Sequence, residues 1–96
     1  MNRAEFDRLV YDVVAGIPAG RVITYGRIAV LIGAPRCPRH VGRAMYHAPQ
    51  GLPCHRVVGG RGNLVEGWPE QRTLLEREGV VFKPNGCVDL KQCLWI

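Results

Sequence analysis

The chain has no acidic residue between Asp12 and Glu66. Its formal net charge is only +5, so positive charge is concentrated in this middle section. A surface of one sign attracts a polyanion at long range, and arginine recognises phosphates and bases better than lysine does. The alternative is a basic face that is merely solvated. The section carries seven arginines and three histidines: Arg21, Arg27, Arg36, Arg39, Arg43, Arg56, Arg61, His40, His47 and His55.

Other features are also missing from the sequence. No apolar run approaches the roughly 20 residues of a membrane-spanning helix, and the first residues do not lead into the apolar region of a secretion signal. The four cysteines include no Cys-x-x-Cys pair, which argues against a zinc site. We therefore expect a cytoplasmic protein with free thiols, no metal, no cofactor and no membrane contact. Ninety-six residues fit a single domain, residues 1–96, which we expect to be monomeric.

Helical periodicity is clear in the first half of the chain. Apolar residues at helical spacing predict an amphipathic helix over residues 4–16. Thr24 is a good N-cap for a second helix over residues 25–32, which Gly33 closes. A third helix begins with Pro38, because proline is tolerated in a first turn.

Two short helices joined by a tight turn, with the second one basic, are typical of a helix-turn-helix, although many small bundles share this pattern. The glycine-rich residues 57–64 predict a hairpin or loop that forms a wing. A fourth helix is expected over residues 69–78, and the Asn85-Gly86 pair predicts a hairpin near the C-terminus. The predicted fold is mainly α: a winged helix-turn-helix of three to four helices with a small β-hairpin or wing.

The segment Pro53-Cys54-His55-Arg56-Val57 carries the strongest chemical signal. A thiolate is the nucleophilic form of cysteine, and cationic neighbours lower the thiol pKa. His55 is placed to take the proton, Arg56 to supply positive charge, and Pro53 to hold the backbone. The bland alternative is a buried and inert cysteine.

These residues resemble the O6-alkylguanine-DNA alkyltransferases, also called methylated-DNA–protein-cysteine methyltransferases. The resemblance extends over about residues 4–82 and corresponds to the C-terminal, DNA-binding domain of the longer members. Besides Pro53–Val58, it rests on four motifs: Ile17-Pro18-Ala19-Gly20-Arg21-Val22, Thr24-Tyr25-Gly26, Arg39-His40-Val41-Gly42-Arg43-Ala44-Met45 and Leu74-Leu75-Glu76-Arg77-Glu78-Gly79.

The resemblance implies a role for each matching residue. Cys54 matches the alkyl acceptor, His55 the histidine that deprotonates it, and Glu78 the glutamate that orients that histidine. Tyr25 matches a tyrosine that binds the flipped guanine, and Arg39 an arginine that fills the gap in the base stack. Chemistry on a base inside a duplex requires such flipping. The resemblance also implies that the basic third helix docks in the minor groove. That groove carries little sequence information, which suits a protein that scans DNA for lesions. The further candidates are Thr24, Arg43, Arg56 and Arg61 as DNA contacts, and Val57 and Trp68 as pocket lining.

The sequence also departs from the alkyltransferase pattern. Ala48 stands where the family usually has an asparagine, and Gly67-Trp68 stand where it has a tyrosine and a serine. These departures resemble the alkyltransferase-like proteins, which bind alkylated guanine, transfer nothing and recruit nucleotide excision repair. Most of those proteins lack the cysteine that this chain keeps at position 54.

Three functions therefore remain open. The first is a single-turnover alkyltransferase acting on duplex DNA that contains O6-alkylguanine. The second is a lesion sensor with nucleotide excision repair proteins as partners. The third is a plain winged-helix DNA binder. Structural readings of individual residues also stay open: Tyr25 as an ordinary half-buried aromatic, Arg39 as a phosphate contact, Glu78 as a solvated carboxylate and Trp68 as a packing residue.

Overall fold

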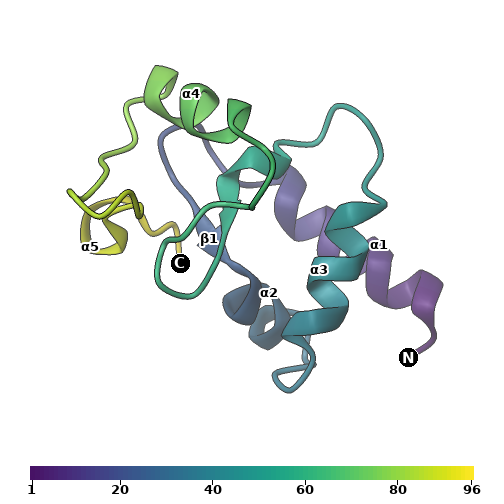
Figure 1. Ribbon diagram of the computed structural model, residues 1–96. Coiled ribbons are helices and arrows are strands. Elements are labelled where there is room, and N and C mark those ends of the chain that lie inside the picture. Colours follow the sequence, from purple (N-terminus) through teal and green to yellow (C-terminus); the bar gives the residue numbers. More distant parts are fainter.

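The computed structural model describes all residues, 1–96, as a mainly helical fold around one very small sheet. Helices α1, α2 and α3 form one half of the molecule, and α4, the C-terminal hairpin and α5 form the other (Figure 1). The elements are α1 (Arg3–Ala15), β1 (Ile23–Thr24), α2 (Tyr25–Leu31), α3 (Pro38–Tyr46), the 3₁₀ turn η1 (Cys54–Arg56), β2 (Val57–Val58), α4 (Glu70–Arg77) and α5 (Leu90–Cys93).

The first three helices confirm the predicted helix-turn-helix. The Thr24 side chain accepts a hydrogen bond from the Arg27 amide and so caps α2. Gly33, with φ at +81°, allows the chain to turn after α2. Helix α3 packs against both α1 and α2. Its buried face is formed by Val41 and Ala44, so its basic side chains are left on the other side.

The sheet divides the hydrophobic core into two clusters. β1 and β2 pair in parallel, with Ile23 opposite Val57 and Thr24 opposite Val58. Successive side chains of a strand point to opposite faces. Val57 therefore joins the cluster around α1–α3, whereas Val58 joins the cluster with Leu75 of α4. The two-residue sheet thus holds both halves of the molecule at the segment that carries Cys54.

Of the two forms expected for the wing, a hairpin or a loop, the structure shows the loop. Residues 57–64 form no hairpin, because Val57-Val58 pair with β1 instead. A tight turn follows, in which the Gly59 amide donates to the Asn63 carbonyl at 2.8 Å. Gly62 has φ at +84°, and a Cβ there would collide with the carbonyl oxygen of Val88. The wing is therefore a compact loop packed on the C-terminal hairpin.

The C-terminal hairpin is confirmed. Phe82 and Val88 form an antiparallel bridge around the predicted Asn85-Gly86 turn. After this hairpin the chain is helical: Leu90 begins α5, because the Asp89 side chain accepts a hydrogen bond from the Lys91 amide and caps a helical turn. All four cysteines are free thiols, as expected. None of the helices combines the length and apolar character needed to cross a bilayer.

Candidate active site and DNA interface

Cys54 begins the turn η1, directly after the loop that leaves α3. Two backbone hydrogen bonds fix this turn: the Cys54 amide donates to the Leu52 carbonyl at 2.8 Å, and the Arg56 amide donates to the Pro53 carbonyl at 3.0 Å. β2 starts at the next residue and anchors the turn to the sheet. The Cys54 side chain is therefore held on a short, well-braced segment at the junction of the two halves.

Glu78, just past the end of α4, binds the side chains of His55 and Arg56 in this turn. Its carboxylate accepts from Arg56 Nη2 at 2.6 Å and from Arg56 Nε at 2.9 Å, and it lies 3.0 Å from His55 Nε2. The hydrogen bonds from Arg56, followed by that from His55, lower the pKa of Glu78 to about 2. Glu78 is thus ionised, and its position at a helix C-terminus, unfavourable for an anion, is compensated by these partners.

The same contacts place Arg56 in a role that differs from the predicted one. We expected Arg56 at the DNA surface. Its third nitrogen, Nη1, donates to the Ile17 carbonyl at 2.7 Å, and only 17% of the side chain is exposed. Since Nε, Nη1 and Nη2 are all engaged within the protein, Arg56 ties the turn to α4 and to the end of α1.

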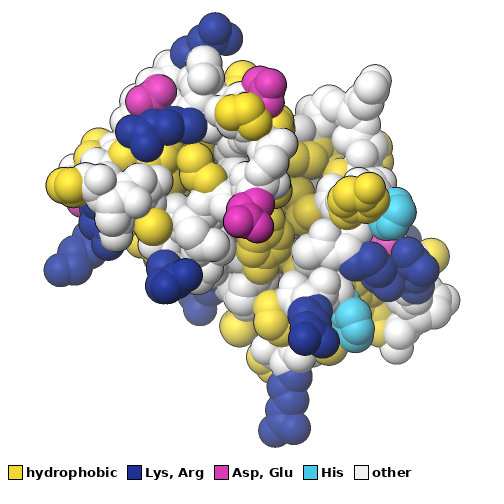
Figure 2. All heavy atoms as spheres, in the orientation of Figure 1, with side chains coloured by type: hydrophobic (Ala, Val, Ile, Leu, Met, Phe, Trp, Pro, Cys, Tyr) yellow, Lys and Arg dark blue, Asp and Glu magenta, His cyan; other side chains and the backbone are white.

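A cavity of about 270 Å³ opens beside Cys54; we call it the base pocket. It lies between α3 and the loop that leads to α4, where the surface is hollowed and lined largely by hydrophobic side chains (Figure 2). Mostly apolar walls with a few polar groups are typical of small-molecule and base sites. The lining residues are Tyr25, Gly42, Met45, Tyr46, Cys54, Val65 and Trp68.

The structure places the two predicted pocket residues, Trp68 and Val57, in different environments. Trp68 lines the base pocket. Val57 does not, because its position opposite Ile23 in the sheet turns its side chain into the core, where only 1% of the residue is exposed. The prediction for Val57 is therefore corrected to a core role.

Burial sets the protonation of the two polar groups in the pocket. Burial, and then the proximity of Cys54, raises the pKa of the Tyr25 hydroxyl above its ordinary value. Burial also raises the pKa of the Cys54 thiol. At neutral pH both groups are consequently protonated, so Tyr25 is a hydrogen-bond donor and Cys54 needs a base to become nucleophilic.

Sequence reasoning missed four lining residues of the base pocket. Gly42 and Met45 lie on α3, within the motif already noted. Tyr46 ends α3 and is 87% exposed. The sequence feature that could have identified it is an aromatic residue at the end of a basic helix. Val65 gave no signal, because only the tertiary structure brings its loop to Cys54.

Gln71 is a further residue that the sequence did not reveal. It is the only buried residue with a polar side chain. Its side-chain amide donates to the carbonyl oxygens of His55 and Val57 and accepts from the amide of Val65. It therefore connects the segment bearing Cys54 with the loop that forms the other wall of the base pocket.

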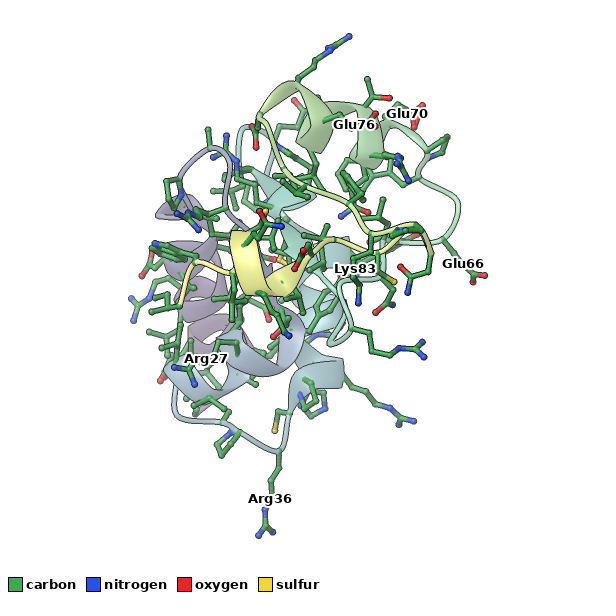
Figure 3. The ribbon with its side chains drawn as sticks, turned by 90° about the vertical axis from the view of Figure 1, so that its left-hand side faces the viewer. Arg27, Arg36, Glu66, Glu70, Glu76 and Lys83 are labelled. Carbon is green, nitrogen blue, oxygen red and sulfur yellow. The ribbon has the colours of Figure 1, made fainter.

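Figure 2 shows basic side chains and histidines over α3, as well as other basic side chains over the half that contains α4 and α5. Arg39, in the first turn of α3, is exposed and forms no hydrogen bond or ion pair within the protein, whereas Arg43 donates to Asp7 at 2.6 Å. Arg43 is therefore held against α1 and is less available to DNA than Arg39. Arg36 extends away from the loop before α3, at the opposite end of the molecule from Glu70 and Glu76 of α4 (Figure 3).

The remaining predicted DNA contacts lie at the edges of this face. The hydroxyl oxygen of Thr24 is used to cap α2. Arg61 is exposed on the wing loop and borders a second depression of about 700 Å³ at the C-terminal hairpin, which contains no other predicted site residue. No group of three or more His, Cys, Asp or Glu side chains is arranged to hold a metal ion.

Comparison with known proteins agrees with this geometry. The chain is 41% identical over 95 residues to the DNA base-flipping protein of Escherichia coli, covering 94% of this chain and 74% of that protein. The fold matches a crystal structure of Schizosaccharomyces pombe Atl1 in complex with damaged DNA containing O6-carboxymethylguanine, with a TM-score of 0.88, 37% identity, and coverage of 100% of this chain and 99% of that one.

A second solved relative comes from Mycobacterium tuberculosis. The crystal structure of Mycobacterium tuberculosis OGT in complex with DNA matches with a TM-score of 0.72 and 42% identity, over 77% of this chain and 49% of that one. This chain therefore spans about half of that protein.

The family assignment rests on most of the chain. Residues 5–80 match the family described as 6-O-methylguanine DNA methyltransferase, DNA binding domain. That range includes most of α1, all of α2–α4, the Cys54 turn and every residue lining the base pocket. The chain belongs to this family.

Proposed function

We propose that the protein binds duplex DNA containing O6-alkylguanine and holds the extruded base in the base pocket. The observation that carries the proposal is the position of this pocket, which opens between the basic helix α3 and the loop before α4 and has Tyr25 and Cys54 in its walls. A base in a duplex cannot reach such a pocket without leaving the stack. The complex of the S. pombe relative with damaged DNA supports the assignment.

Arg39 is the residue that we assign to the vacated position in the duplex. It projects from the first turn of α3, is exposed and has no partner in the protein. An extruded base leaves a gap in the stack, and a planar guanidinium can stack there at little cost of desolvation. Docking through phosphates and groove shape, without base-edge contacts, suits a protein that searches for damage in any sequence.

We further propose that Cys54 accepts the alkyl group. The bond between Sγ and the alkyl carbon forms while the bond between that carbon and O6 of guanine breaks. His55 takes the thiol proton; Glu78 occupies its Nε2, which leaves Nδ1 as the free base. The guanine anion takes a proton from the Tyr25 hydroxyl, which His55 then replenishes. The products are a thioether and guanine, and no cofactor is needed.

The second candidate is a lesion sensor that binds O6-alkylguanine without transfer and presents it to nucleotide excision repair proteins. The raised pKa of the Cys54 thiol favours it, because burial keeps the thiol protonated and the Arg56 guanidinium binds Glu78 rather than the thiol. In both candidates the base pocket is completed within one chain, which supports a monomer as the active unit. The four free cysteines support a cytoplasmic location.

Binding to matched duplexes tests the shared part of the proposal. One duplex carries a single O6-methylguanine and the other carries guanine, and a neighbouring 2-aminopurine reports unstacking by its fluorescence. We expect tighter binding and a fluorescence increase with the lesion. Equal affinities for the two duplexes would contradict lesion recognition and leave only general DNA binding. A covalent gain of one methylene mass at Cys54 separates transfer from sensing.

A further inference from the structure

The side-chain amide of Gln71 uses its hydrogen-bonding groups on three backbone partners. Its Nε2 donates to the carbonyls of His55 and Val57, each at 3.1 Å, and its Oε1 accepts from the Val65 amide at 2.8 Å. The residue is 0% exposed. A buried polar group is costly unless it is satisfied, so a fully satisfied amide in the core ties its partners firmly together.

These three partners lie in two segments that each contribute a lining residue to the base pocket. His55 and Val57 follow Cys54 directly, so their carbonyls fix the turn that forms one wall. Val65 itself lines the pocket, together with Trp68, from the loop before α4. No other side-chain hydrogen bond connects the segment 54–58 with the loop 59–68. Gln71 is therefore the polar bridge that sets their separation.

Helix α4 contacts the Cys54 turn at both of its ends. Glu78 binds the side chains of His55 and Arg56, whereas Gln71, in the first turn of α4, binds backbone groups. The first contact orients the histidine. The second has no charge and no group that titrates near neutral pH, so its effect is purely one of position.

We propose that Gln71 is a positioning residue that fixes the loop wall of the base pocket relative to Cys54 and thereby sets how strongly the protein prefers alkylated over unmodified DNA. The proposal rests on the function proposed above, in which this pocket holds the extruded base. Pocket walls held within a fraction of an ångström discriminate ligands better than mobile ones. The general affinity for DNA depends on the basic face over α3, which Gln71 does not touch.

The test uses Gln71→Met, which keeps a side chain of similar length and volume but removes all three hydrogen bonds. Gln92→Met is the matched control, because the side chain of Gln92 is exposed on α5 and contacts only Asp89. Dissociation constants are measured for the duplex with O6-methylguanine and for the unmodified duplex. We expect the ratio of the two constants to fall about tenfold in Gln71→Met, with affinity for unmodified DNA within about twofold of wild type. Gln92→Met should retain both values.

The outcomes distinguish a positioning role from a purely structural one. A variant that is merely less folded loses the same factor on both duplexes, and its ratio is unchanged; that result would overturn the proposal. Hydrogen exchange of the Val65 amide in the wild-type protein gives a second check. We expect slow exchange, since this amide donates to Gln71, and fast exchange would exclude the bridge. If wild type itself shows no lesion preference, the proposed function fails and the inference falls with it; if wild type shows the preference and Gln71→Met keeps it, only the inference fails.

Discussion

Tyr25 and Cys54 share the base pocket, and both are protonated by reason of burial. The hydroxyl of Tyr25 is therefore a donor to whatever base enters. Tyr25→Phe keeps the ring and its packing but removes this donor, so the fold should be retained. Affinity for lesion-bearing DNA should fall by about 1–3 kcal/mol in titrations.

Tyr11→Phe is the control for that change. The Tyr11 hydroxyl donates to the Ala44 carbonyl at 2.7 Å and does not line the base pocket. Removing the Tyr11 hydroxyl should lower the free energy of unfolding by about 1 kcal/mol and leave the preference for lesion-bearing DNA intact. An unchanged lesion affinity in Tyr25→Phe would remove Tyr25 from the binding site.

Glu78 links the site to stability through its pKa of about 2, which lies below the ordinary value of 4.5. A lowered pKa in the folded state means that the carboxylate stabilises the fold above about pH 4.5 and loses that effect as the pH falls toward 2. The contribution is about 1–3 kcal/mol after screening by solvent. Denaturant titrations from pH 7 to pH 2 should show this decline.

Glu78→Gln should be less stable at pH 7 by that amount and should show a flatter pH profile. Glu76→Gln is the control, because its pair with Arg72 is half exposed and contributes little. A Glu78→Gln profile that declines as steeply as wild type would show that other carboxylates dominate the acid response.

Arg39 and Arg43 both lie on α3 and were both expected to contact DNA, but the structure gives them different environments. Arg39 is free, whereas Arg43 is paired with Asp7 and stacks near the ring of Phe6. Arg39→Ala should therefore lose preference for lesion-bearing DNA more than it loses general affinity, because an inserted side chain matters only when a base is out. Competition between the two duplexes measures this preference.

Arg43→Ala should instead lower the free energy of unfolding, with a smaller effect on lesion preference. Its Nη2 is bound to Asp7, and removing it leaves that carboxylate unpaired. Equal losses of Arg39→Ala on both duplexes would make Arg39 a phosphate contact.

At the level of elements, local signals predicted the helices well. Thr24 as a cap, Gly33 as a turn and Pro38 in a first turn act within a few residues, so they can be recognised without the fold. The motif around Cys54 predicted the chemical group for the same reason, and Glu78 came from a family resemblance that the observed contacts support.

Long-range partners could not be predicted in this way. The sequence shows Arg56 as a free cation, and only the fold brings Glu78 and the Ile17 carbonyl to it. The motif includes Val57, which favours a place in the pocket, but its pairing with Ile23 turns its side chain into the core. Gln71 carries no sequence signal, because its partners are backbone groups 6 to 16 residues away.

Over the whole molecule, acidic residues are absent from the section that contains α2 and α3 but are frequent around α4. Residues 13–65 contain no carboxylate, whereas Glu66, Glu70, Glu76 and Glu78 lie in or beside α4. DNA binding should therefore weaken strongly with salt and depend little on sequence. Titrations at several salt concentrations should give a linear fall of log K with log salt.

Variants of Arg61 and Arg77 test whether the salt dependence arises from one face of the molecule. Both are exposed, but Arg61 lies on the wing loop and Arg77 at the end of α4. Arg61→Ala should reduce the salt slope by about one and weaken both duplexes equally, and Arg77→Ala should change neither. A flat salt response in wild type would contradict the basic interface.

The most direct test of the central claim is the mass of the protein after incubation with a duplex containing O6-methylguanine. Transfer predicts one added methylene mass on the peptide that contains Cys54, reached once per molecule, without a cofactor, and absent from Cys54→Ser and from samples with unmodified duplex. Lesion preference without any mass gain would contradict transfer and leave Cys54 as a wall of a sensor's pocket.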